Sequence, residues 1–109
     1  MNQPSLFDEK IIETNKVILY ALGEFQSRKK LLAERELPLD RLRGAFKRAC
    51  EKFGIDEFSD EESAKNLENL GAKITQVPNF VAKHPFRVIV SNELAEKSLE
   101  YYQEVVTND

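Results

Sequence analysis

Apolar residues recur at helical spacing from Asp8 to about Glu34, which predicts a long first helix. A second apolar face lies almost opposite the main stripe. A helix with two apolar faces is either sandwiched within a core or shared with a second protomer. In so small a chain we favour sharing, and we expect a homodimer seam at Val17, Tyr20 and Leu31. The main stripe comprises Ile11, Ile18, Leu22 and Phe25, flanked by Ile12 and Leu19.

A second helix is expected after Pro38, because proline disfavours helical backbone at the residue that precedes it. This helix runs from about Leu39 or Asp40 to Phe53, where Gly54 provides a natural end. Its predicted apolar face comprises Leu39, Leu42, Phe46, Ala49, Cys50 and Phe53.

A third helix and two strands are expected next. Ser59 with Glu62 forms a capping box, which predicts a helix through Leu70. Residues 72–77 and 86–90 have the composition and alternation of strands, so we expect a two-stranded hairpin.

The connection Asn79–His84 is too long for a tight turn and suits a wing-like loop. Ser91 then caps a last helix over residues 92–106. The order of three helices, a hairpin and a further helix resembles a winged helix-turn-helix over roughly residues 37–90. The resemblance implies an α+β, mainly helical, winged-helix-like fold.

The composition indicates one folded domain. The chain has 109 residues, of which 41% are hydrophobic and 32% charged, as in ordinary globular proteins. One cysteine suits a reducing compartment, and no apolar run is long enough to span a membrane. The first residues lack the basic and apolar layout of a signal peptide, so we expect a cytoplasmic protein without a membrane partner.

Positive charge gathers in one part of a chain whose net charge is −3. Nine basic residues between Arg28 and Lys52 face four acidic ones. In a winged-helix arrangement these cations could lie along duplex DNA, although basic residues on a solvated helix face need no partner. The candidate phosphate contacts are Arg41, Arg43, Lys47, Arg48 and Lys52, with Lys83 and Arg87 from the wing.

The first eight residues carry a short motif. Gln3-x-Ser5-Leu6-Phe7 resembles the peptide by which bacterial replication and repair proteins dock onto the sliding clamp. The resemblance implies that Leu6 and Phe7 enter an apolar cleft while the Gln3 amide orients the peptide. Alternatively, Ser5 is the N-cap of the first helix, with Asp8 reaching back to it.

Residue types suited to catalysis do not form clusters in the sequence. His84 is the single histidine and Cys50 the single cysteine, and Cys50 belongs to the apolar stripe of the second helix. The adjacent acidic residues Asp60, Glu61 and Glu62 splay apart along a helix and do not suggest an acid–base pair. We therefore expect no catalysis, no metal site and no cofactor.

Together these patterns predict a flexible peptide at residues 1–8 and one winged-helix-like domain at residues 9–109. The function that we expect is a non-catalytic adaptor recruited to the sliding clamp through Gln3, Ser5, Leu6 and Phe7. A winged-helix DNA-binding regulator and a pure protein-interaction module are the alternatives. The acidic start of the third helix weighs against reading of the DNA major groove.

Overall fold

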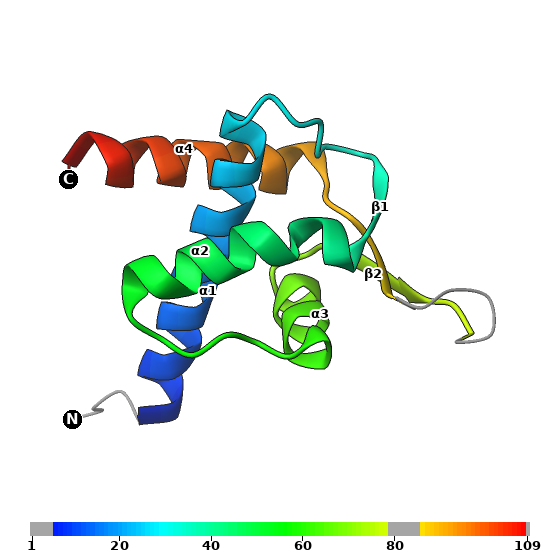
Figure 1. Cartoon of the computed structure of the whole chain (residues 1–109), viewed down its shortest axis with the longest axis horizontal. Coiled ribbons are helices and arrows are strands. Elements are labelled where there is room, and N and C mark those ends of the chain that lie inside the picture. Colours follow the sequence, from blue (N-terminus) through cyan, green and yellow to red (C-terminus); the bar gives the residue numbers. More distant parts are fainter. Residues whose placement is uncertain (1–5, 79–85, 109) are drawn as a thin grey trace.

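A computed structural model describes residues 6–78 and 86–108, with side chains from residue 13 onward (Figure 1). The expected α+β, mainly helical class is confirmed. In the described residues the elements are α1 (Leu6–Ser27), β1 (Glu36–Pro38), the 3-10 helix η1 (Leu39–Leu42), α2 (Arg43–Phe53), α3 (Asp60–Asn69), β2 (Lys73–Gln76), β3 (Phe86–Ile89) and α4 (Asn92–Asn108).

Helix α1 is the centre of the fold, because α4 and α2 both pack against it. The predicted main stripe is buried where the structure describes it, with Ile18 and Leu22 fully inaccessible and Phe25 6% exposed. Helix α4 crosses the C-terminal half of α1, and α2 crosses its middle (Figure 1). The hydrophobic core therefore surrounds α1.

Two of the three residues predicted for a homodimer seam, Val17 and Tyr20, are not available to a second protomer. Val17 is fully buried and Tyr20 is 9% exposed within a single chain. The Tyr20 ring lies 5.6 Å from the Phe53 ring of α2 and 5.1 Å from the Tyr102 ring of α4, measured between centroids. Leu31 lies outside α1 and is 71% exposed. The second apolar face of α1 is thus covered by the chain's own helices.

Helix α1 also ends at Ser27, earlier than the predicted end near Glu34. Lys29 has a left-handed φ of 63°, which interrupts the helix. Beyond it, Leu32 is buried, Ala33 forms a parallel bridge with Val90, and the Glu34 N–H donates to the Val90 carbonyl over 2.7 Å. A continued helix would lose these contacts, so tertiary pairing overrides local helical propensity.

The predicted boundaries of α2 and α3 are confirmed within a few residues. Gly54 ends α2 with a left-handed φ of 68°, a conformation that costs glycine little. The capping box of α3 is complete: the Glu62 N–H donates to Ser59 Oγ over 3.1 Å, and the Ser59 N–H donates to Glu62 Oε1 over 2.9 Å. These ends are set by local chemistry.

The predicted hairpin is confirmed, and a third strand joins it. Strands β2 and β3 are antiparallel, and β1 pairs with the other edge of β3, giving the order β1-β3-β2. Leu37 lies opposite Val88, and both are buried in the hydrophobic core. Sequence patterns missed β1 because it has three residues and ends at Pro38, which an edge strand tolerates.

Helix α4 begins where the sequence predicts. Ser91 Oγ accepts the Leu94 N–H over 3.2 Å, and Glu34 Oε1 accepts the Asn92 N–H over 3.1 Å. The helix continues to Asn108, slightly beyond the predicted end. Glu34 therefore ties the loop after α1 to the start of α4.

Candidate interaction surface

The turn of residues 54–59 and helix α3 present an acidic surface. The inner face of α3 buries Ser63, Ala64 and Leu67, and this burial fixes which residues point outward. The capping box fixes the start of the helix, and three acidic residues in its first turn suit the positive end of the helix dipole. The exposed residues of α3 include Glu61, Glu62, Lys65, Glu68 and Asn69.

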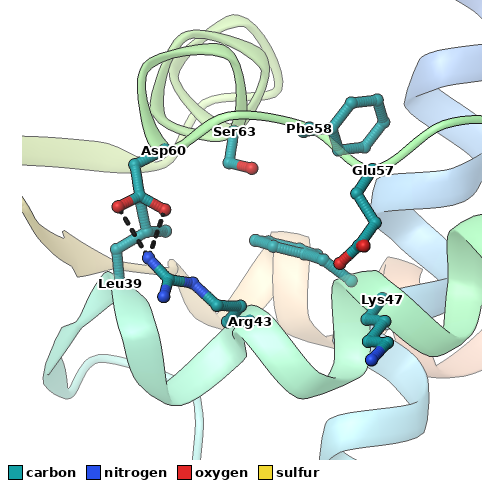
Figure 2. A pocket seen from close by; sticks show the side chains of 8 residues that line it. Leu39, Arg43, Lys47, Glu57, Phe58, Asp60 and Ser63 are labelled. Carbon is teal, nitrogen blue, oxygen red and sulfur yellow. Dashed lines mark hydrogen bonds and ion pairs between the residues drawn. The ribbon is translucent and has the colours of Figure 1, made fainter.

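Arg43, a predicted phosphate contact, pairs instead with the start of α3. Its Nη2 lies 2.9 Å from Asp60 Oδ1 and 2.8 Å from Oδ2, as Figure 2 shows. The hydrogen bond and charge of Asp60 raise the pKa of the Arg43 guanidinium, which stays cationic. Because this pair is exposed, it adds little stability, and its main effect is to orient the start of α3 relative to α2.

Arg48, a second predicted phosphate contact, pairs with α1. Its Nε lies 2.6 Å from Glu24 Oε1, and the Glu24 side chain is 11% exposed. Arg28 approaches the same oxygen at 3.4 Å. A carboxylate so far removed from water needs cationic partners, so Arg48 serves the contact between α1 and α2.

The other predicted phosphate contacts are spread over several elements. Arg41 in η1 and Lys47 in α2 are exposed. Lys52 is also exposed, with Nζ lying 5.7 Å from the centroid of the Tyr20 ring. Arg87 is half-buried in β3, opposite Pro38 and Thr75, and Lys83 lies outside the described residues. The structure does not gather the expected cations into one surface.

A small hollow lies between α2, the turn and α3 (Figure 2). Its volume is about 20 Å³, room for about one water molecule. Phe46 and Phe58 line it, and Glu57 reaches from the turn toward α2. The hollow is too small for a ligand.

A larger cleft of about 550 Å³ opens between α1, the turn and the start of α3. Half-buried Ile55 and Phe58 contribute apolar surface to it. Sequence reasoning missed this cleft, because Glu13 is distant in sequence from the turn and only packing brings them together. The carboxylates that line it belong to Glu13, Asp56, Glu57 and Glu62.

The predicted clamp peptide is described only in part. Helix α1 begins at Leu6, so the backbone of Leu6 and Phe7 is helical. Gln3 and Ser5 lie outside the described residues. A helix that starts at Leu6 has the position expected if Ser5 is its N-cap, the alternative that the sequence offered.

The described residues offer few groups for catalysis or metal binding. Among them, no three His, Cys, Asp or Glu side chains gather closely enough to hold a metal ion. Cys50 is fully buried in α2, and desolvation raises the pKa of its thiol, so its reactive thiolate is disfavoured. His84 lies outside the described residues.

Comparisons of the chain with protein-family models, with curated proteins and with solved structures find no match. In the part of the chain that the structure describes, no helix combines the length and apolar character needed to cross a membrane.

Proposed function

We propose that this chain is a non-catalytic adaptor of winged-helix architecture, which docks onto the bacterial replication sliding clamp through Gln3, Ser5, Leu6 and Phe7. The acidic surface of its turn and α3 faces protein partners and not DNA. Clamp docking rests on the motif Gln3-x-Ser5-Leu6-Phe7 in the sequence, and the choice of protein partners over DNA rests on the acidic surface.

The order of elements supports the winged-helix part of the proposal. Helices α2 and α3, joined by the turn of residues 54–59, correspond to a helix-turn-helix, and β2 with β3 corresponds to the wing. Strand β1 between α1 and α2 completes the sheet at the free edge of β3. Because a fold does not dictate function, the surface of the scaffold decides what it binds.

The charge of α3 supports protein binding over DNA reading. In DNA-binding helix-turn-helix proteins the second helix supplies the base contacts. Here that helix exposes Glu61 and Glu68 beside a single cation, Lys65, and phosphates would be repelled. Arg43 and Arg48, which could offset this charge, already pair with Asp60 and Glu24.

The helical backbone of Leu6 and Phe7 must open before the terminal motif can dock as an extended peptide. An extended peptide would require the first turn of α1 to unwind. The first turn of a helix lacks half of its backbone hydrogen bonds, so its opening costs little compared with global unfolding. Leu6 and Phe7 would then be released to anchor in an apolar pocket.

Replacement of Leu6 and Phe7 by Ala tests the proposal. We expect the full-length double variant to lose at least about tenfold in affinity for purified sliding clamp, because such anchors carry most of the binding energy of a peptide. Surface plasmon resonance measures the loss, and circular dichroism checks that the helices remain. The matched control, Lys10→Ala, should bind like the parent chain; equal binding by the double variant contradicts the proposal.

A winged-helix DNA-binding regulator is the second candidate. It is favoured by the exposed cations Arg41 and Lys47 on η1 and α2, with Arg87 in the sheet. The salt dependence of duplex binding separates it from the adaptor.

A further inference from the structure

The loop of residues 28–35 holds an exposed apolar residue in a fixed position. Leu31 is 71% exposed, while its neighbour Leu32 is 2% exposed and anchors the loop in the core. Glu34 anchors the end of the loop through its hydrogen bonds to Val90 and Asn92. Lys29 and Glu34 both have left-handed φ values, of 63° and 61°, which cost conformational free energy in residues other than glycine. The surrounding contacts therefore maintain a conformation that presents Leu31 to solvent.

Cations surround this apolar tip. Arg28, Lys29, Lys30 and Arg35 are all exposed. Arg28 shares Glu24 with Arg48, but no ion pair is formed by Lys29 or Lys30 within the described residues. The loop thus combines one apolar side chain with local positive charge, a combination suited to an acidic site with apolar surface.

The acidic cleft of the same chain has the complementary chemistry. It joins the carboxylates of Glu13, Asp56 and Glu57 to apolar surface from Ile55 and Phe58, in about 550 Å³. That volume lies within the range of sites that enclose compact ligands. A leucine side chain with two lysines beside it therefore matches the cleft in polarity and charge.

One copy of the chain cannot bring its own loop and cleft together. Glu13 lies near the start of α1, and the loop follows its last residue, Ser27. At 1.5 Å per residue the helix keeps these sites about 20 Å apart. Figure 1 shows the loop after α1 beside the start of α4, whereas the turn crosses the N-terminal half of α1.

We propose that the loop of residues 28–35 of one copy docks in the acidic cleft of a second copy, with Leu31 against Ile55 and Phe58 and Lys29 and Lys30 beside the carboxylates. This contact joins two different surfaces of the chain, the loop of one copy and the cleft of the next. A pair keeps one free cleft on the first copy and one free loop on the second, so further copies add head to tail. Such association weakens with salt, because its charged groups are exposed.

The inference is independent of clamp docking, since it uses none of residues 3–7. Nucleic acid is a poorer partner for the loop, because phosphates would pair with the lysines but would leave the Leu31 side chain exposed to water. An anionic lipid surface could accept both the lysines and Leu31, and the experiment distinguishes this occupant.

Sedimentation velocity of the full chain at low salt, over a hundredfold range of concentration, tests the proposal. We expect the mean mass to rise with concentration. Lys30→Glu with Leu31→Ser defines a loop variant, and Glu13→Lys with Asp56→Lys defines a cleft variant. Each variant alone should remain monomeric. An equimolar mixture should form one-to-one heterodimers, in which the intact loop of the cleft variant docks in the intact cleft of the loop variant. These heterodimers should not grow, because no further intact loop or cleft is left. Heterodimer formation also demonstrates that both variants are folded.

The matched control combines Lys97→Glu with Val106→Ser, which removes one exposed cation and the second large exposed apolar side chain among the described residues. It should associate like the parent chain. A parent chain that stays monomeric, variants that still associate, or a mixture that fails to pair would each overturn the proposal. Flotation with phosphatidylserine vesicles completes the test. If the parent chain is monomeric and binds these vesicles, and the loop variant does not, the loop binds lipid and the proposal is overturned.

Discussion

At the scale of single residues, Gly23 sets how closely α1 and α4 approach. A Cβ atom added there would collide with Tyr102 Cβ and with the Ser98 carbonyl oxygen. The close crossing also lets Gln26 Nε2 donate to the Ala95 carbonyl over 2.9 Å. Glycine is unfavourable within a helix, so its place here is explained by packing and not by backbone conformation.

We expect Gly23→Ala to lower the free energy of unfolding by about 1–3 kcal/mol, because backbone atoms of α4 must move to admit the methyl group. Urea denaturation followed by circular dichroism measures the change. Gly44→Ala is the matched control, since the nearest atom to its added Cβ is Arg48 Nη1, at 3.3 Å, on a flexible side chain. The control should be neutral or stabilising by up to about 1 kcal/mol; equal destabilisation of both variants would contradict the packing explanation.

At the scale of elements, the features that sequence predicts are those with local causes. The capping box of Ser59 and Glu62, the left-handed Gly54 and the break at Pro38 each act within a few residues. The early end of α1 and the existence of β1 depend instead on pairing with residues near Val88 and Val90. No local pattern reports such distant partners.

The same limit applies to the candidate site. The sequence correctly places Arg43 and Arg48 on a basic helix, but it does not show that α3 and α1 supply their carboxylate partners. Nor can periodicity distinguish a helix face covered by a second protomer from one covered by α2 and α4, as Tyr20 illustrates. Solvent exposure of a predicted contact is decided by tertiary packing.

The contact between α1 and α2 provides a test at this scale. We expect Arg48→Met to lower the free energy of unfolding by about 1–2 kcal/mol, a value between those of exposed and buried pairs, because Glu24 keeps only the more distant Arg28. Arg43→Met removes the more exposed pair with Asp60 and should cost less than about 1 kcal/mol. Thermal unfolding of both variants measures the two losses of stability. A larger loss of unfolding free energy for Arg43→Met than for Arg48→Met would contradict the greater weight given to the pair of Arg48 with Glu24.

At the scale of the whole molecule, charge is segregated. The loop after α1 is basic, whereas the turn and α3 are acidic. Basic α2 lies between these regions, but both of its arginines are paired with carboxylates. A surface divided in this way favours oriented contact with proteins over general attraction to a polyanion.

We therefore expect duplex DNA binding to be weak at about 50 mM salt, with a shallow logarithmic slope that corresponds to no more than about two phosphate contacts. Fluorescence anisotropy over a salt series measures this slope. The double variant Arg41→Ala with Lys47→Ala should bind little differently from the parent chain. A steep slope that falls in this variant would support the DNA-binding regulator.

The packing of α1 against α4 constrains the order in which the chain can complete its fold during synthesis. Residues Ile18 and Leu22 emerge from the ribosome early, but α4, which helps to cover α1, emerges after all the other described elements. Until then the apolar side of α1 lacks part of its cover, and the loop after α1 lacks Asn92 as a partner. The nascent chain is therefore most exposed to misassembly in the interval before α4 is made.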